Sequence, residues 1–174
     1  HAQFWRDDFN GPALDPRWRT SNLGQLRYDL ENGQFNVRGF GGGGPARGHM
    51  IRDAGDLTFE FDFRSRVTFA DGPRGAFYFN IGNVEFSVTN EFGPFVVYSG
   101  AGFDPLPITP GTREFRAVGN DGAWSLYIDD LPVVVNRPIP LDRVYIRVGF
   151  LGYPQTTTQF FPCSIDYIEI MPVP

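Results

Sequence analysis

The sequence predicts an all-β chain that folds as one domain, residues 1–174, with two antiparallel sheets stacked as a β-sandwich. Short runs alternate apolar and polar residues, and Gly, Pro, Asn and Asp separate these runs. Helical periodicity never persists beyond a turn or two. The 21 Gly and 15 Pro residues are typical of a chain with many turns, and 18 Phe residues predict a core of aromatic rings. Roughly a dozen strands are expected at this spacing.

The clearest pattern is Arg113–Val135, REFRAVGNDGAWSLYIDDLPVVV. It predicts three short strands, with tight turns at residues 119–122 and at Asp129-Asp130. Alternation of period two broken by Asn, Asp and Gly is typical of an antiparallel meander.

The N-terminal third predicts a short strand within Phe4–Asn10 and then a loop whose Trp18 packs back on the body. A hairpin is expected within Tyr28–Val37, because Asn32-Gly33 is a strong turn signal. Gly39–Gly48 is predicted to be a flexible loop. A glycine run can cradle phosphate between a strand and a helix, but no helix pattern and no Lys follow here.

The middle of the chain predicts strands with one apolar face. Leu57–Val67 would bury Phe residues and expose a solvated ion-pair face that includes Asp62. Gly75–Ile81 and Val84–Thr89 form a predicted hairpin that turns at Gly82-Asn83. Phe95–Ser99 is expected to place Tyr98 opposite Phe95 and Val97.

The C-terminal third predicts a strand at Arg143–Phe150, with Tyr145 and Arg147 facing outward, and a closing strand at Ser164–Met171. The one cysteine, Cys163, lies beside Phe160-Phe161, so a buried thiol is favoured over interchain pairing.

Composition excludes some classes of function. The formal net charge is -5, all 15 basic residues are Arg, and the pI is near 4.9, which argues against nucleic-acid binding. No uninterrupted apolar run of about 18 residues is present, so membrane insertion is not expected. The first two residues, His-Ala, suit either the tail of a signal-peptidase site or the remnant of an expression tag. An extracellular or periplasmic location would suit the composition.

Three segments together resemble the concanavalin A-like lectin/glucanase jelly-roll superfamily, which includes laminin-G-like and family-16-glucanase-related domains. They are DDFNGPALDPRW near the start, SLYIDD in the meander and IDYIEI at the end. The resemblance covers nearly the whole chain and implies a jelly-roll sandwich. It does not fix function, because both lectins and enzymes share this layout.

The glucanase branch of the superfamily carries Glu-x-Asp-x-Glu on one strand, with the three carboxylates on one face. The matching strand here keeps Glu85 but has Ser87 and Thr89 at the other two positions. Glu91 could supply a second carboxylate from the following loop. A jelly-roll lyase would need a Tyr base with Arg or His, and Tyr98, Tyr145 and Arg147 could serve, although the Gln-x-His motif is missing.

Glycan binding needs fewer matched groups, namely stacked rings and a few fixed polar side chains. The resemblance places seven candidates on the concave sheet: Tyr78, Asn80, Glu85, Ser87, Tyr98, Tyr145 and Arg147. Ordinary solvent-facing residues are the alternative interpretation for each one. Glucanases carry a stacking Trp at the position that is Gly149 here.

The resemblance also implies a structural Ca²⁺ ion near the chain ends. Asp166 would supply the carboxylate, with backbone carbonyls from Arg6, Asp7 and Gly33. The alternative is a surface Asp166 that pairs with an Arg. His1 and His49 together could bind copper, but a processed N-terminus is favoured.

Three hypotheses for function follow. The first is a non-catalytic, lectin-like domain that recognises a polysaccharide or other glycan on the concave sheet. The second is a glycoside hydrolase or polysaccharide lyase with a non-standard site. The third is a self-associating structural subunit, which would require large exposed apolar patches.

Overall fold

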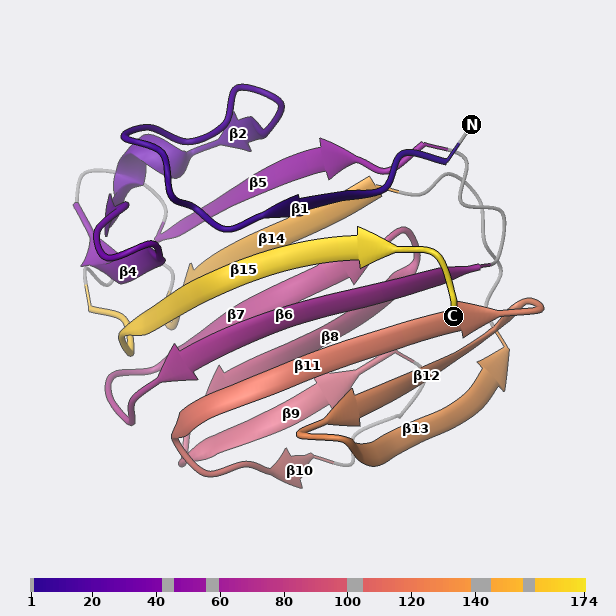
Figure 1. The fold of residues 1–174 in the computed structure, drawn as a ribbon. Coiled ribbons are helices and arrows are strands. Elements are labelled where there is room, and N and C mark those ends of the chain that lie inside the picture. Colours follow the sequence, from indigo (N-terminus) through magenta and orange to yellow (C-terminus); the bar gives the residue numbers. More distant parts are fainter. Residues whose placement is uncertain (1, 42–45, 56–59, 100–104, 139–144, 155–158) are drawn as a thin grey trace.

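A computed structural model describes residues 2–41, 46–55, 60–99, 105–138, 145–154 and 159–174. Two antiparallel sheets stack face to face, which confirms the predicted β-sandwich (Figure 1). Within these ranges the helical structure is the single 3₁₀ turn Leu23–Gln25. None of the described residues form a helix that is long and apolar enough to cross a membrane.

One sheet has eight strands. In spatial order its path is β13 (Leu131–Pro138), β12 (Ala123–Ile128), β11 (Gly111–Asn120), β6 (Phe61–Phe69), β15 (Cys163–Met171), β4 (Phe35–Phe40) and β3 (Leu26–Asp29). The eighth strand, β1 (Trp5–Asp7), pairs with the second half of β15, beyond the segment that pairs with β4. The first and last strands of the chain are therefore hydrogen-bonded neighbours.

The other sheet has seven strands. Its order is β10 (Leu106–Pro107), β9 (Pro94–Tyr98), β8 (Val84–Asn90), β7 (Gly75–Ile81), β14 (Tyr145–Gly152), β5 (Arg47–Asp53) and β2 (Arg19–Ser21). Neighbouring pairs along this sheet are antiparallel, as predicted for a jelly roll.

The predicted hairpin turns are confirmed by backbone dihedrals. Asn32 and Gly33 have φ values of 59° and 65°, and Asp129 and Asp130 have values of 51° and 64°. Consecutive positive φ values suit a two-residue turn whose twist matches the flanking strands, and Asn, Asp and Gly adopt them most readily.

Aromatic rings fill the space between the sheets. Phe79 is fully buried, and its ring centroid lies 5.3 Å from that of Phe86, 5.5 Å from Phe63 and 6.2 Å from Phe115. Cys163 is buried as predicted, and burial raises the pKa of its thiol. The thiol therefore stays protonated and unreactive.

Three details of the predicted strands are wrong. Val96 is the fully buried residue of β9, so Phe95 and Val97 face outward and Tyr98 lies on the core-facing side, opposite Phe86. The ion-pair face predicted for β6 is present, but Asp62 within it is only 4% exposed, because the guanidinium groups of Arg64 and Arg116 cover it. Both ends of the predicted loop Gly39–Gly48 belong to strands, since Gly39 and Phe40 end β4 and Arg47 and Gly48 begin β5. Residues 42–45 between them lie outside the described residues. Leu57–Phe59 lie outside the described residues.

The strands at the sheet edges are short or irregular. β2 has three residues, β10 has two and β3 has four. β13 is longer, but its pairing with β12 shifts register twice, and Asn136 within it has a φ of 49°. β13 also contains Pro132 and Pro138.

Candidate functional site

The outer face of the seven-stranded sheet brings most of the predicted binding residues together. Arg147, Asn80 and Glu85 are direct cross-strand partners on β14, β7 and β8. One row further along, Gly149, Tyr78 and Ser87 are partners in the same way. Six predicted residues share this face: Tyr78, Asn80, Glu85, Ser87, Tyr145 and Arg147. Tyr98 does not lie on this face, because its side chain is on the core-facing side of β9.

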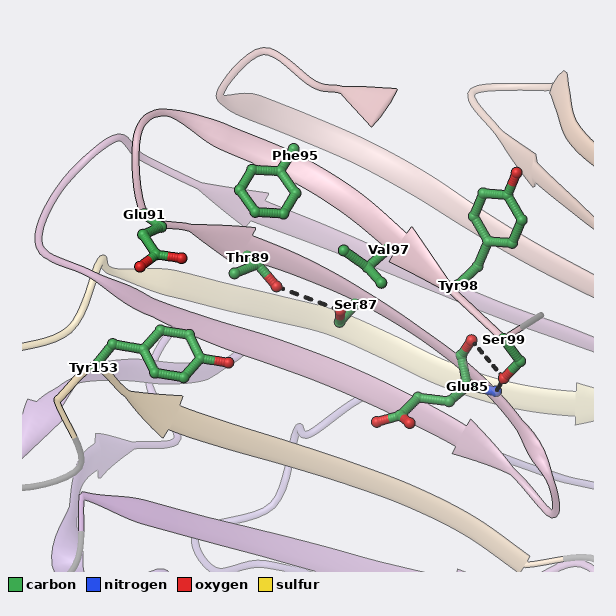
Figure 2. Close-up of a pocket in the computed structure, with 9 residues that line it drawn as sticks. All are labelled: Glu85, Ser87, Thr89, Glu91, Phe95, Val97, Tyr98, Ser99 and Tyr153. Carbon is green, nitrogen blue, oxygen red and sulfur yellow. Dashed lines mark hydrogen bonds between the residues drawn. The ribbon is translucent and has the colours of Figure 1, made fainter. Parts of the chain in front are cut away.

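A groove of about 380 Å³ runs along β8 and β9 on this face. Its lining residues are Glu85, Ser87, Thr89, Glu91, Phe95, Val97, Tyr98, Ser99 and Tyr153. Figure 2 shows Glu85 and Glu91 toward opposite ends of the groove, with Ser87 and Thr89 between them. Tyr153 follows the end of β14 and directs its hydroxyl toward the space above β8. Tyr98 projects away from the groove at one end (Figure 2).

The hydroxyl groups of the groove are held in different ways. Ser99 Oγ accepts a hydrogen bond from the Glu85 amide at 2.7 Å and donates to the Glu85 carbonyl at 3.1 Å, so it closes the end of the β8–β9 pair. Ser87 and Thr89 have hydroxyl oxygens 3.5 Å apart, which is too long for a strong bond. Burial, together with the charges of Glu91 and Glu85, raises the pKa of Tyr153. Tyr153 therefore presents a protonated hydroxyl that can donate to a ligand.

Tyr78 occupies the space above Gly149. A Cβ atom added at Gly149 would lie 1.9 Å from Tyr78 Cζ, so the phenol ring covers this glycine closely. The resemblance to glucanases predicts a stacking Trp on β14, at the position of Gly149. Here the aromatic ring at this place is Tyr78, which comes from the neighbouring strand β7. Gly149 is required because any side chain there would displace the ring.

Arg147 carries a charge on this face that lacks an ion-pair partner among the described residues. Its Nε is buried without a hydrogen-bond partner, and no ion pair among the described residues includes it. Its guanidinium lies 5.3 Å from the centroid of the Tyr145 ring. Buried donors are rarely left unsatisfied in proteins, so Arg147 is well suited to bind an acceptor group on a ligand.

His49 also lies on this face, opposite Gly149, and sequence reasoning missed it as a member of the site. Burial lowers the pKa of His49, and the nearby charges of Arg147 and Arg47 lower it further. The imidazole is therefore neutral at pH 7 and can both donate and accept a hydrogen bond.

We expect the titration of His49 to report this environment. Its pKa should lie below the ordinary value of about 6.5, and Arg147→Met should raise it, because one neighbouring positive charge is removed. NMR of the imidazole Cε1–H groups can measure this, since the chain has two histidines and His1 serves as a reference. A group whose pKa is depressed by folding lowers stability as the pH falls from about 6.5 through its folded pKa. An unchanged His49 pKa in Arg147→Met, with Arg38→Met as a surface control, would contradict this interpretation.

The two groove carboxylates cannot act as a glycosidase pair. Glu85 and Glu91 are six residues apart along an extended strand, which is roughly 20 Å at ~3.4 Å per residue. Hydrolysis of a glycoside needs two carboxylates about 5–9.5 Å apart. Glu91 is also paired with Arg74, so the suggestion that it completes a catalytic site is wrong.

Two of the four residues predicted to bind calcium have side chains with other partners, although the prediction for Asp7 concerns its backbone carbonyl. Asp7 accepts hydrogen bonds from Trp18 Nε1 at 2.7 Å and from the Phe9 amide at 2.8 Å. Asp166 accepts from the side-chain amide of Gln34 and lies 4.0 Å from an Arg66 nitrogen. Within the described ranges no three His, Cys, Asp or Glu side chains form a group that could hold a metal. At Asp166, the nearby guanidinium and the amide donor both oppose a bound cation.

The two stacked sheets have a jelly-roll fold like that of concanavalin A-like domains, which confirms the predicted resemblance at the level of the fold. No protein-family model and no curated protein matches the sequence. The chain is similar to the CBM2 module of the evolved Dit protein of Lactobacillus casei BL23 phage J-1, with a TM-score of 0.71, 13% identity and coverage of 97% of this chain and 94% of that chain.

Two further solved structures show the same fold. The Emp47p carbohydrate recognition domain has a TM-score of 0.65 and 14% identity, with coverage of 95% of this chain and 93% of that chain. A β-1,3-glucanase from Mycobacterium marinum has a TM-score of 0.64 and 13% identity, with coverage of 96% and 97%. At such identities the likeness establishes the fold alone.

Proposed function

We propose that this domain binds a glycan along the groove on the outer face of the seven-stranded sheet, without cleaving it. The main observation is the composition of the groove. Ser87, Thr89 and Tyr153 offer hydroxyls, Phe95 and Val97 offer apolar surface, and Glu85 is a carboxylate without an ion-pair partner among the described residues. Sugars are bound by this combination of fixed polar groups and apolar or aromatic contact.

Among the described residues that line the groove, none places a second carboxylate within reach of Glu85, and this favours binding over hydrolysis. The similar structures give this proposal further support, because their names include a carbohydrate-binding module, a carbohydrate recognition domain and a glucanase. A glycan-binding domain suits the extracellular or periplasmic location predicted from the sequence.

A glycan array on the purified domain, read beside release of reducing ends from the same polysaccharides, tests the proposal. We expect binding without product. Tyr153→Phe and Ser87→Ala each remove one hydroxyl while keeping the shape of the groove. Each should weaken binding by about 3–10-fold, since a hydrogen bond contributes about 0.5–1.5 kcal/mol.

Tyr127→Phe provides the matched control, because Tyr127 lies on β12 in the other sheet and its loss of a hydroxyl should leave affinity unchanged. Product release that is abolished by Glu85→Gln would overturn the proposal in favour of an enzyme. No binding on the array, with light scattering that shows self-association, would favour the structural subunit instead.

Calcium binding remains a proposal that rests on the resemblance. A rise in melting temperature on adding CaCl₂, lost in Asp166→Asn, would establish it. An unchanged melting temperature would agree with the hydrogen bonds that Asp166 makes in the structure.

A further inference from the structure

Arg52 is a charged side chain buried inside the sandwich. It lies on β5 at a core-facing position and is 4% exposed. Its guanidinium carbon lies 4.2 Å from the centroid of the Trp5 ring and 6.0 Å from that of Trp18. Nη1 of Arg52 is buried and has no hydrogen-bond partner. A buried cation normally needs both a counter-charge and acceptors for its N–H groups.

The acidic side chains around Arg52 are committed to other partners. The Asp7 carboxylate accepts hydrogen bonds from Trp18 Nε1 and from the Phe9 amide. Asp15 forms an ion pair with Arg17, and Asp53 forms one with Arg19 at 3.2 Å. Within the described part of the chain, no ion pair reaches Arg52. Burial lowers the pKa of Arg52 and the charge of Arg17 lowers it further, while the charges of Asp15 and Asp7 offset this in part.

A pocket of about 260 Å³ lies beside this group. It is lined by Gln3, Phe4, Trp5, Arg17, Arg52 and Asp53, and it shares no residue with the groove on the outer face. The volume has room for several water molecules at ~30 Å³ each, and hence for a small organic anion. Of the six described residues that line it, two are arginines and one is the acidic Asp53, although the chain as a whole has a net charge of -5.

We propose that this pocket is a binding site for an oxyanion, a carboxylate or sulfate group, presented either by an acidic sugar or as a free ion. A planar guanidinium matches the two oxygens of such a group, and its stacking on Trp5 holds it in a fixed orientation. The anion would add a negative charge to those of Asp15 and Asp7 and would offer acceptor oxygens to the guanidinium. This site is independent of the proposed glycan groove, so either can fail without the other.

The indole N–H groups give a direct test. The chain has three tryptophans, and Trp5 Nε1 donates to the Asp53 carbonyl at the pocket, at 3.1 Å. Sodium glucuronate, sodium sulfate and glucose are titrated into ¹⁵N-labelled protein at constant ionic strength set with NaCl. The Trp5 signal should shift saturably with an oxyanion and stay in place with glucose. The Trp124 signal should not move, because Trp124 lies on β12 beside Tyr98.

Variants separate a binding role from a structural one. Arg52→Gln should weaken binding of the oxyanion at least tenfold. If this variant does not fold, Arg17→Gln serves instead, because Arg17 is on the surface, and a loss of about threefold is expected from one removed charge. Arg38→Gln is the matched control, since Arg38 forms a similar exposed ion pair with Asp29 outside the pocket and should bind as the unaltered protein does.

The outcomes are distinct. Binding of glucuronate but not sulfate assigns the pocket to an acidic sugar, and binding of sulfate alone assigns it to a free inorganic ion. Either result supports an oxyanion site. The proposal is overturned if neither salt shifts the Trp5 signal, or if Arg17→Gln and Arg38→Gln weaken binding equally.

Discussion

Replacing Phe79 by alanine is expected to lower the free energy of unfolding by about 3–5 kcal/mol. The ring is fully buried between the sheets and contacts the rings of Phe63, Phe86 and Phe115. These neighbours belong to three other strands, so they cannot all close around the space that the ring leaves. Urea denaturation followed by tryptophan fluorescence measures the change, and the melting temperature should fall by about 10 °C.

Phe92→Ala is the matched control, because Phe92 is 93% exposed and the same substitution there removes no packing. Its effect should stay within about 0.5 kcal/mol. A loss below about 1 kcal/mol in Phe79→Ala would show that the core can collapse around the cavity, and would contradict the rigid packing described here.

Asp62→Asn is expected to lower the free energy of unfolding by about 2–4 kcal/mol. Asp62 accepts two hydrogen bonds of 3.0 Å from Arg116 and longer ones of 3.2 and 3.4 Å from Arg64. Asparagine keeps the shape, but its NH₂ group faces guanidinium donors and the two positive charges lose their shared counter-ion. Thermal and urea unfolding both measure this loss.

Asp8→Asn offers the comparison, since Asp8 pairs with Arg6 where both side chains are 45% exposed. An exposed ion pair contributes about 0–1 kcal/mol, so this variant should unfold almost as the unaltered protein does. Equal losses in the two variants would show that the burial of Asp62 adds nothing to its ion pairs.

The sequence predicted strands well where a side chain on every second position is apolar. Phe77, Phe79 and Ile81 alternate with Tyr78 and Asn80, and the structure buries the first set and turns the second outward. β5 was missed because the pattern fails there. Its core-facing positions are Gly48, Met50 and Arg52, and a buried arginine makes the strand look polar on both faces.

The candidate site was predicted only in part, because its geometry depends on pairs of strands. Periodicity placed Tyr78 and Ser87 on one face, but nothing local shows that Tyr78 covers Gly149. Tyr98 was assigned to the wrong face since β9 has four apolar or aromatic residues in succession, which gives no alternation to follow. Tyr153 and His49 join the face through the register of β14 and β5, which only the structure gives.

The form of the edge strands bears on how the molecule avoids forming fibrils. A fibril grows when a long, regular edge offers an unbroken row of free N–H and C=O groups to a further strand. β13 is the longest edge here, and it lacks N–H groups at Pro132 and Pro138 and is distorted by its register shifts. The edges at β10, β2 and β3 have two to four residues each. Among the described strands, no long and regular edge is therefore available to a further strand, even though the core is rich in phenylalanine.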